Sequence, residues 1–427
     1  MKDTDSEEMA KRIWVTDKLL AILKRYGFRM VEPSPIENLE TLEAKCGSSI
    51  RDEIFWFEDK AKRKQGLRFD LTVGLARMVA SHYDWPMPLK LSAVSNMWRY
   101  DEPQRGRYRC FYQWDAEIFG TSEVEADAEI IALSLDLMEN MGLKDNEARI
   151  NNRKFVEGFL DSLDISENED LAAVLRVIDK FRKLSSVAIR EEFNKIGLNS
   201  EKIEKILEFA SIRGEPKKVL TVLSKFLTDN EKTKEGYNEL SRLVGLIEAF
   251  GKISHCILDM SIVRGIGYYD GIVFEVFDKK NEDIGSIIGG GRFNNLCRIY
   301  GRDLPATGVA GGIERLMLSL EKSGVMPKIS QESSVFVSAV DDSVRSKVLE
   351  IVKQLRDKGI STEFDLKKRS LTRQLEYADN SGIPYTVIIG SNEIEKGAVK
   401  LRDMKKRTEI ELTLEKLFEI LISNNFA

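Results

Sequence analysis

Four arginines lie close together in one polar segment of the sequence, Arg99-Tyr-Asp-Glu-Pro-Gln-Arg-Gly-Arg-Tyr-Arg109. It is flanked by the apolar stretches KLSAVSNMW and CFYQWDAEIFG, which predicts two strands joined by a polar loop. Arg99 is predicted within the first strand, where a charged side chain is costly unless it is paired or bound to a ligand. We interpret the segment as a cradle for an anion, and a solvated hairpin tip is the structural alternative.

Three other segments combine glycine with charged or aromatic side chains. One is IVRGIGYYDG, in which Arg264 stands among glycines ahead of Tyr268 and Tyr269, whose hydroxyls can bind a polar ring. A hairpin corner with aromatic packing is the structural alternative for this segment. The others are IIGGGRF and GVAGGIERL, and glycine lets a ligand or a neighbouring segment approach the backbone closely. A dinucleotide-binding G-x-G-x-x-G unit is disfavoured and no G-x-x-x-x-G-K-[ST] loop is present, so a bound nucleotide must be held in another way.

The composition argues against several other kinds of site. The 427 residues carry only two histidines and four scattered cysteines without a C-x-x-C pair, so neither a zinc site nor a histidine-based triad is expected. Unpaired thiols suit a reducing cytoplasm, where we expect the protein. The polar N-terminus has no apolar signal core, and no window approaches about 18 uninterrupted apolar residues, so no membrane span is expected. A net charge of −5 argues mildly against nucleic-acid binding, but a local basic strip can carry such contacts.

The spacing of apolar residues predicts three regions. Residues 1–150 and 251–328 contain hairpin-linked strands with flanking helices, which predicts an α+β domain built on a mixed, mainly antiparallel sheet. Residues 151–250 show only helical periodicity, so we expect a helical insertion. Residues 330–427 alternate strands and helices with short connections, which predicts a separate α/β unit with βαβ crossovers.

Taken together, these segments resemble the class II aminoacyl-tRNA synthetases, and specifically the histidyl-tRNA synthetases, over essentially the whole chain. MWRYDEPQRGRYRCFYQWDAEIFG resembles motif 2 of the class, GVAGGIERL resembles motif 3, and the region of GFRMVEPSP resembles motif 1, a dimer-interface element. RGIGYYDG and IGGGRF resemble the two peptides peculiar to the histidyl enzymes. The resemblance implies a class II catalytic domain, a C-terminal anticodon-binding domain and a homodimer. It also implies L-histidine, ATP with Mg²⁺, and histidine tRNA as substrates and cofactors.

The resemblance further implies which residues hold each substrate. Arg99 and Arg264 would straddle the α-phosphate of ATP and stabilise the transition state, and we expect Arg264 to have no structural partner. Phe111 would stack on adenine, while Arg107 and Arg315 would hold the β- and γ-phosphates. The residues implied at ATP are Arg99, Asp101, Arg107, Phe111 and Arg315. The residues implied at histidine are Asp70, Leu71, Thr72, Arg99, Gln113, Glu117, Arg264, Tyr268 and Tyr269.

Within the histidine set, the side chains are expected to divide between the two ends of the amino acid. The α-ammonium would be held by Asp70, Thr72 and Gln113, whereas the imidazole would be bound by Glu117 and Tyr269, with Tyr268 closing the pocket. Two positions depart from the family pattern. Gly267 stands where the family commonly has Asp, and Glu102 is acidic where some bacterial members have Arg in a loop that faces the acceptor end of the tRNA.

Two alternative functions belong to other classes of protein. The first is the catalytically dead paralogue that regulates the ATP-phosphoribosyltransferase of histidine biosynthesis, against which Arg99, Arg264 and the C-terminal unit argue. The second is a class II synthetase for threonine, proline or glycine, against which the lack of zinc ligands and the peptide RGIGYYDG argue.

In the C-terminal unit, Lys367-Lys368-Arg369 and Lys405-Lys406-Arg407 would provide a local RNA-binding face, with solvated loops as the structural alternative.

Overall fold

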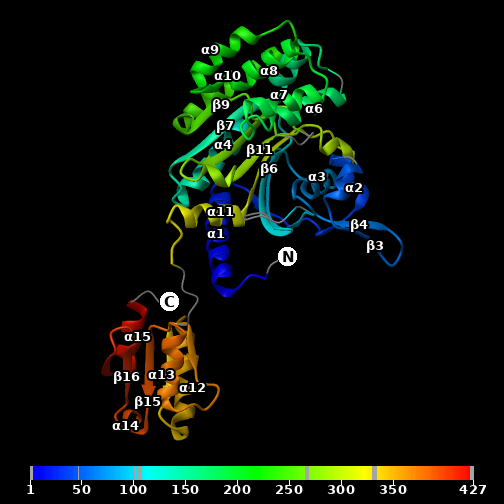
Figure 1. The fold of residues 1–427 in the computed structure, drawn as a ribbon. Coiled ribbons are helices and arrows are strands. Elements are labelled where there is room, and N and C mark those ends of the chain that lie inside the picture. Colours follow the sequence, from blue (N-terminus) through cyan, green and yellow to red (C-terminus); the bar gives the residue numbers. More distant parts are fainter. Residues whose placement is uncertain are drawn as a thin grey trace. The chain divides into compact units, whose positions relative to one another are not determined.

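The chain forms two compact units, Met1–Lys328 and Ile329–Ala427 (Figure 1). The computed structural model describes residues 3–46, 48–100, 102, 108–166, 168–264, 269–328 and 334–423. Each unit has a β-sheet and an apolar core of its own. Among the described residues, no helix combines the length and the apolar character needed to cross a membrane.

The first unit is built on a mixed sheet with the strand order β1-β5-β6-β12-β11-β10-β7-β9-β8 among its described residues. Neighbouring strands from β5 to β7 are all antiparallel, and only the pairs β1·β5 and β7·β9 are parallel. This confirms the mixed, mainly antiparallel sheet predicted from the sequence. The strands are β1 (Arg29–Met30), β5 (Leu89–Trp98), β6 (Cys110–Phe119), β7 (Asn146–Asn152), β8 (Arg213–Gly214), β9 (Cys256–Asp259), β10 (Ile272–Asp278), β11 (Ile288–Arg292) and β12 (Ala306–Gly312).

Side chains alternate across β6 and so separate the two faces of the large sheet. Trp114 and Ile118 point to the face covered by α4, a helix whose side chains are buried almost all round because α1, α10 and the sheet enclose it. Gln113 and Glu117 point to the opposite face, where α3 packs. That second face is only partly covered, and it carries the pocket described below. The helices next to the sheet are α1 (Ser6–Arg25), α3 (Thr72–Ser81), α4 (Val124–Asn140) and α11 (Ile313–Lys322).

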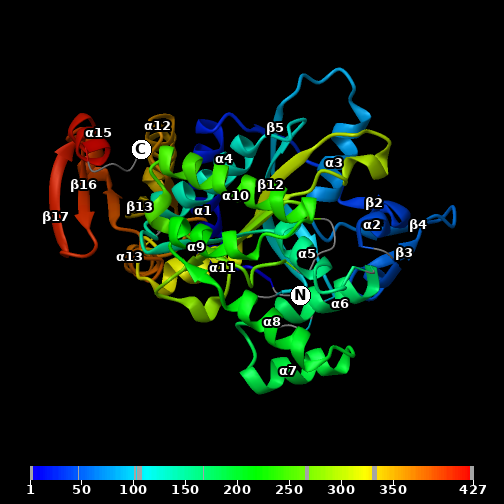
Figure 2. The ribbon, with the colours of Figure 1, turned by 90° about the horizontal axis from the view of Figure 1, so that it is seen from above.

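Residues 151–250 are almost entirely helical, as their periodicity predicts (Figure 2). Two glycines allow α5 and α10 to lie very close together. A Cβ atom on Gly158 would stand 2.7 Å from the backbone nitrogen of Thr233, and one on Gly236 would stand 2.5 Å from that of Phe155. Their apolar side chains join the same buried cluster as α4, so this region packs as part of the first unit. The helices are α5 (Arg153–Asp161), α6 (Asn168–Ile178), α7 (Ser186–Lys195), α8 (Ser200–Ser211), α9 (Pro216–Leu223) and α10 (Glu231–Ala249).

A small sheet with the order β2-β4-β3 stands beside the large one, and a buried arginine connects them. Arg68 donates from Nε to the carbonyl of Asn96 at 2.9 Å and from Nη1 to the carbonyl of Pro33 at 2.6 Å. Because Arg68 follows β4 directly, these bonds fix the start of α3 relative to β5, and with it the position of Asp70. The elements here are β2 (Ile36–Asn38), α2 (Leu39–Cys46), β3 (Trp56–Glu58) and β4 (Lys64–Leu67).

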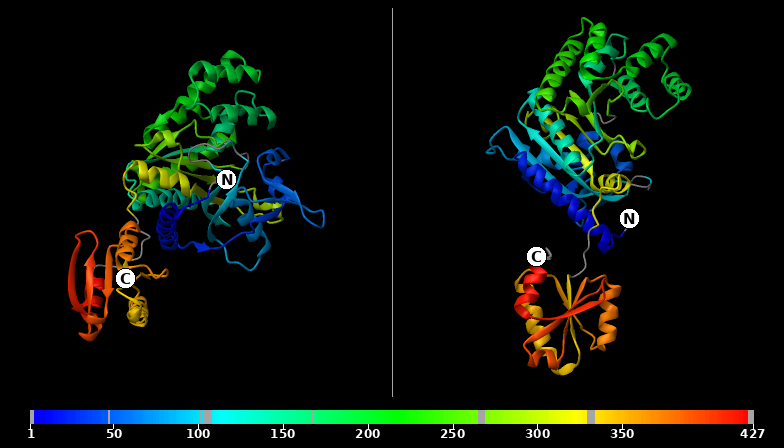
Figure 3. Two further views of the ribbon diagram at one scale, coloured as in Figure 1. Left: turned by 60° about the horizontal axis from the view of Figure 1, so that its bottom comes forward. Right: turned by 90° about the vertical axis from the view of Figure 1, so that its left-hand side faces the viewer.

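The second unit has a sheet with the order β14-β13-β15-β16-β17, whose first three strands are parallel (Figure 3). Helices α12 and α15 pack on one face, and α13 packs on the other. The parallel strands and their crossover helices confirm the predicted βαβ organisation. The elements are β13 (Val335–Ala339), α12 (Arg345–Asp357), β14 (Thr362–Phe364), α13 (Leu371–Asn380), β15 (Tyr385–Ile389), α14 (Ser391–Glu395), β16 (Ala398–Asp403), β17 (Thr408–Thr413) and α15 (Leu414–Ser423).

One buried ion pair joins α4 to the end of β11. The guanidinium of Arg292 donates from Nε and Nη2 to Asp127 Oδ2 at 2.9 and 2.7 Å, and both side chains are almost completely buried. Its remaining donors reach the carbonyls of Thr121 and Glu123. Every part of this arginine is therefore engaged in holding the covered face of the sheet to its helix.

Replacing Asp127 with Ala should strongly destabilise the first unit, because Arg292 would be left as a buried charge without its counter-ion. We expect the free energy of unfolding to fall by about 3–5 kcal/mol. All five tryptophans of the chain lie in the first unit, so their fluorescence during urea denaturation reports on that unit alone. The matched control is Asp303→Ala, which removes a similar but exposed pair with Arg298 and should leave the curve nearly unchanged. Equal effects from the two variants would contradict this account.

Candidate active site

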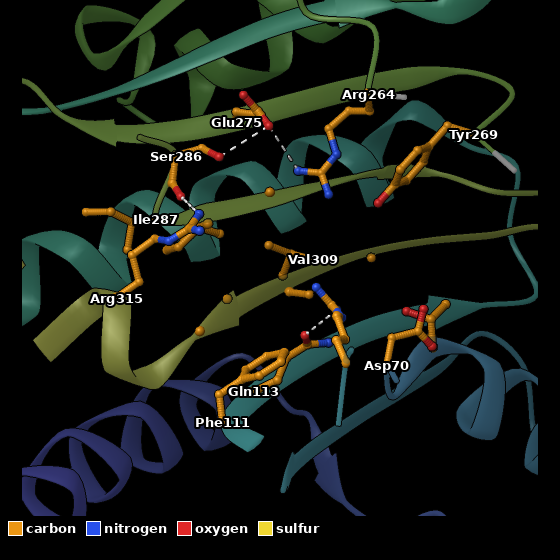
Figure 4. A pocket seen from close by; sticks show the side chains of 18 of the residues that line it. Asp70, Phe111, Gln113, Arg264, Tyr269, Glu275, Ser286, Ile287, Val309 and Arg315 are labelled. Atoms are coloured by element: carbon orange, nitrogen blue, oxygen red, sulfur yellow. Dashed lines mark hydrogen bonds and ion pairs between the residues drawn. The ribbon is translucent and has the colours of Figure 1, made fainter. Parts of the chain in front are cut away.

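A pocket of about 390 Å³ opens on the partly covered face of the large sheet (Figure 4). Strands β6, β10, β11 and β12, the start of α3 and the start of α11 all contribute to its lining. The structure thus brings together segments as far apart in the sequence as those of Asp70 and Arg315. The residues predicted for the site that line this pocket are Asp70, Thr72, Arg99, Phe111, Gln113, Glu117, Arg264, Tyr269 and Arg315.

Of the other predicted residues, only Leu71 is described by the structure. Leu71 is fully buried in the apolar cluster beneath α3, next to Leu75, so its side chain is part of the core and not of the pocket lining. The reason is geometric, because consecutive residues at the start of a helix point in different directions. The predicted residues Asp101, Arg107 and Tyr268 lie outside the described residues.

The floor of the pocket is formed by two glycines that leave room for charged side chains. A Cβ atom on Gly289 of β11 would stand 1.6 Å from Nη1 of Arg264, and one on Gly308 of β12 would stand 2.7 Å from Cγ of Glu117. Real Cβ atoms do not approach other atoms so closely. The guanidinium of Arg264 and the carboxylate arm of Glu117 therefore occupy space that side chains at these two positions would fill. Gly289 belongs to the segment IIGGGRF and Gly308 to GVAGGIERL, so each of these two glycine-rich segments makes room for one charged side chain.

A chain of hydrogen bonds runs along β6 at one side of the pocket. Arg99 donates from Nη2 to Gln113 Oε1 at 3.1 Å, and Gln113 in turn donates from Nε2 to Asp115 Oδ1 at 2.9 Å. Thr72 donates its hydroxyl to the other oxygen of Asp115 at 3.2 Å. Asp115 is fully buried and was missed by the sequence analysis, although it stands as a charged residue on the same face of an apolar strand as Gln113 and Glu117. It orients two of the predicted ligand-binding groups.

Arg99 follows directly after β5, at the strand end rather than within the strand as expected. Its Nε donates to the carbonyl of Phe69 at 2.8 Å, and its guanidinium carbon lies 5.0 Å from the ring centre of Phe111. These contacts hold the arginine over the pocket. Its charge, which would be costly in a strand, is accommodated by a carbonyl, an amide and an aromatic face.

Arg264 enters the pocket from the opposite side (Figure 4). Its Nη1 lies 3.4 Å from Oε1 of Glu275, and its guanidinium carbon lies 5.5 Å from the ring centre of Tyr269. Ser286 donates its hydroxyl to the same oxygen of Glu275 at 3.2 Å. The expectation that Arg264 has no structural partner is therefore wrong. Glu275 and Ser286 were missed, and the only sequence signal for Glu275 is a single charge within the apolar run IVFEVF.

The start of α11 contributes two further charged residues. Both carboxylate oxygens of Glu314 accept hydrogen bonds from the backbone N–H of Tyr112, at 3.0 and 3.1 Å, which ties the helix to β6. Burial raises the pKa of this carboxyl, and the nearby Arg12 opposes that effect. Arg315 donates from Nη1 to the carbonyl of Ser286 at 2.7 Å and so lies across the pocket from Arg99.

The mouth of the pocket includes two residues of the helical region that the sequence analysis also missed. Asp179 and Lys183, which form an ion pair at 3.2 Å, both line it. They lie just beyond α6, where no motif marks them. The helical region is thus part of the pocket wall.

The distribution of charge indicates what the pocket can bind. Guanidinium groups of Arg99, Arg264 and Arg315 surround it, whereas the carboxylates of Asp70 and Glu117 lie along the α3 and β6 side. Such a pocket suits a ligand set with an anionic part and a separate part that donates hydrogen bonds, such as an amine or a ring N–H.

Comparison with known proteins gives consistent results over the whole chain. A family model described as Histidyl-tRNA synthetase matches residues 1–316, and one described as Anticodon binding domain matches residues 334–424. The chain is 37% identical over 432 residues to the histidine–tRNA ligase of Thermococcus kodakarensis, covering 98% of this chain and 97% of that protein. It is 36% identical over 416 residues to that of Pyrococcus abyssi, covering 97% and 95%. The crystal structure of histidyl-tRNA synthetase from a Nostoc species superposes with a TM-score of 0.84 at 28% identity, covering 99% of both chains.

Replacing Gly308 with Ala should weaken binding of L-histidine, because the added methyl group would displace Glu117 near its backbone, where the side chain cannot easily yield. Calorimetric titration should show a dissociation constant about ten- to a hundredfold higher, the range expected for overpacking by one methyl group. Gly245→Ala is the matched control. Gly245 is exposed on α10, and no atom lies within 4 Å of the position that an added methyl group would take, so its replacement should not change binding. An unchanged affinity in Gly308→Ala would show that Glu117 does not contact the ligand.

Proposed function

Because this chain belongs to the histidyl-tRNA synthetase family, we propose that the pocket on the large sheet activates L-histidine with ATP and then transfers it to tRNA. The observation that carries the proposal is that arginines of three separate segments line one pocket over a glycine floor, together with the carboxylates of Asp70 and Glu117. The overall activity is that of a histidine–tRNA ligase, as the curated relatives are named. The roles of individual residues are our inference from the pocket.

The first step joins two anions. An oxygen of the histidine carboxylate forms a bond to the α-phosphorus of ATP, the bond from that phosphorus to the bridging oxygen breaks, and pyrophosphate leaves. Arg99 and Arg264 approach the pocket from opposite sides, so they would neutralise both the carboxylate and the phosphate and stabilise the charge of the transition state. In the second step, a hydroxyl of the terminal adenosine of the tRNA attacks the histidyl carbonyl carbon, and AMP leaves.

The ATP end of the pocket lies toward α11. Phe111 would stack on adenine, and Arg315 would exchange its bond with the Ser286 carbonyl for one with the distal phosphates, where Arg107 would join it. Asp101 would contact the adenine amino group. Support for this placement comes from Gly312, which lines the pocket beside Arg315 and, without a side chain, permits close approach of a flat or charged group.

The histidine end lies toward α3 and β6. Asp70, Thr72 and Gln113 would hold the α-ammonium group, and the last two are already oriented by the buried Asp115. Glu117 and Tyr269 would bind the imidazole, and Tyr268 would close the pocket. An amino acid without ring nitrogens would leave these polar groups unpaired, which typically costs about 10⁴–10⁵-fold in specificity.

Magnesium enters the proposal with ATP. It usually keeps several waters and binds through one or two carboxylates together with substrate phosphates. Within the described part of the chain there is no group of three or more His, Cys, Asp or Glu side chains that could hold a metal, which suits an ion held mainly by ATP. Glu314, a pocket carboxylate next to Arg315, would be its protein ligand. When bound, the ion would neutralise part of the phosphate charge.

The second unit is proposed to read the anticodon. The two basic clusters named in the sequence lie at opposite ends of its sheet, because one follows the carboxyl end of β14 and the other follows the carboxyl end of the antiparallel strand β16. The two clusters therefore offer two separate candidate contacts to RNA. One end of the sheet would carry the contact, with Lys367 and Lys368 or with Lys405 and Lys406 at the RNA phosphates.

We also propose a homodimer in the cytoplasm. Strand β1 is an edge strand of the large sheet, and Met30 and Ile36 close to it are large apolar side chains that are more than one third exposed. A second copy related by a two-fold axis would cover them, in the region predicted to resemble motif 1. Cys110, Cys256 and Cys297 are free thiols, which suits a reducing compartment.

The direct test of the function is ATP–pyrophosphate exchange with each amino acid in turn. Exchange that depends on histidine alone supports the proposal, whereas dependence on threonine, proline or glycine would indicate another class II specificity. Absence of exchange with every amino acid would favour the regulatory paralogue.

In the active protein, Arg264→Ala should lower kcat by about 10²–10³-fold, since one preorganised cationic contact to the transition state is lost.

The matched variant at this position is Arg264→Lys, which should restore only part of the rate because an ammonium group cannot make the two-pronged guanidinium contact. The urea unfolding curve of Arg264→Ala should stay close to that of the parent, since its partner Glu275 is partly exposed and keeps Ser286. A variant with normal kcat, or one that is unfolded, would remove Arg264 from the catalytic residues.

Deleting residues 330–427 should separate the two half-reactions. We expect histidine-dependent exchange to be largely kept, because all residues proposed for adenylation lie in the first unit, which has its own core. Charging of histidine tRNA, measured by incorporation of labelled histidine, should fall strongly. Charging at full efficiency after the deletion would mean that the second unit does not read the tRNA.

A further inference from the structure

Arg264 has an unusual backbone conformation for a residue with a long side chain. Its φ angle is +49°, in the left-handed region that residues other than glycine, asparagine and aspartate rarely adopt. This conformation directs the side chain back over β11, where it lies against the Cα of Gly289. A guanidinium on such a long side chain has many rotamers, so its position over the pocket must be determined by the groups around it.

The sheet register shows which group does this. Glu275 of β10 and Gly289 of β11 are direct cross-strand partners. Side chains of directly opposed residues normally lie side by side on the same face. Because Gly289 has no side chain, the guanidinium of Arg264 occupies the place beside Glu275 that a side chain of Gly289 would take, and its Nη1 comes to 3.4 Å from Oε1 of Glu275.

Glu275 is itself held in place. Ser286, two residues before β11 begins, donates its hydroxyl to the same Oε1 of Glu275 at 3.2 Å (Figure 4). On the other side of β10, the cross-strand partner of Glu275 is Arg149, whose guanidinium is taken up by Glu147 and Glu282. The carboxylate of Glu275 therefore faces Arg264 and the pocket, with about a quarter of its side chain exposed.

Two arginines near β11 differ in how tightly they are paired. Arg292 ends that strand, whereas Arg264 precedes β10 and its guanidinium lies over Gly289. Arg292 makes short bonds of 2.7 and 2.9 Å to Asp127 and is buried, whereas the contact of Arg264 with Glu275 is longer, at 3.4 Å, and partly exposed. A longer contact to a partly exposed carboxylate orients a guanidinium without binding it as strongly as a short, two-pronged pair. A short two-pronged pair would instead compete with an incoming anion.

We infer that Glu275 is a positioning residue for Arg264, which together with the space above Gly289 holds the guanidinium in place for the histidine carboxylate and the α-phosphate. This inference rests on the proposed function of the pocket. Glu275 acts through the arginine and does not itself contact the substrates. Its negative charge also offsets part of the repulsion among Arg99, Arg264 and Arg315 before the substrates bind.

The experiment is a double-mutant cycle in histidine-dependent ATP–pyrophosphate exchange with the full-length protein. Glu275→Gln keeps the size of the side chain and its bond with Ser286 but removes the charge that holds Arg264. We expect kcat to fall by about ten- to a hundredfold, the scale of misplacing one catalytic group, with KM for histidine changed less than about threefold. In the Arg264→Ala background the same substitution should change kcat by less than about twofold, because the group it positions is already gone.

Two further variants keep the result interpretable. Gly289→Ala fills the place of the guanidinium and leaves the charge of Glu275 unchanged, so it should lower kcat in the same way and also lose its effect in the Arg264→Ala background. Glu282→Gln removes a carboxylate from the neighbouring pair with Arg149, outside the pocket, and should leave kcat and KM unchanged. The urea midpoint from tryptophan fluorescence shows whether each variant is folded.

The outcomes are distinct. If the parent protein shows no histidine-dependent exchange, the proposed function fails, and the role of Glu275 fails with it. If the parent is active but Glu275→Gln and Gly289→Ala have normal kcat, only the positioning role fails. Equal losses from Glu275→Gln with and without Arg264 would also overturn it, because they would show an effect independent of the arginine. A rise in KM for histidine at constant kcat would instead make Glu275 a substrate-binding residue.

Discussion

A charged side chain can lie flat across a β-sheet only where the strand beneath it carries no side chain. Strands β11 and β12 provide that space at Gly289 and Gly308, and the two groups that occupy it are the guanidinium of Arg264 and the carboxylate arm of Glu117. Because the sheet floor is flat and rigid there, charges from β6 and from the segment before β10 come within reach of one ligand. The pocket depends on this absence of side chains more than on any single contact.

The opposite face of the same sheet is held in a contrasting way. Trp114 and Ile118 of β6 pack against α4, and the buried pair of Arg292 with Asp127 joins helix to sheet with every donor engaged. On the open face, the contact of Arg264 with Glu275 is longer, at 3.4 Å, and partly exposed. A saturated arginine stabilises the fold, and an arginine with donors still directed to the pocket is the kind that stabilises developing charge.

Electrostatic separation within the pocket follows from strand alternation. The odd-numbered residues Gln113 and Glu117 of β6 line the pocket and Asp115 lies buried between them on the same face, so acceptors for a cationic or N–H-bearing ligand gather along this strand. Arginines arrive from the end of β5, from the approach to β10 and from the start of α11. On the proposed function, an amino acid and a nucleotide would lie side by side in this pocket.

The sequence by itself determined the secondary structure pattern, the mainly antiparallel first sheet and the βαβ second unit, because periodicity is a local property. Its resemblance to a family pointed to nine of the 24 residues that line the pocket. It did not show that the side chain of Leu71, between Asp70 and Thr72 in sequence, packs in the core. Only the tertiary structure decided that Glu275 and Ser286 meet Arg264, that Asp115 orients Thr72 and Gln113, and which glycine makes room for which charge. Those relations depend on the register between strands far apart in the chain, and no local pattern encodes that register.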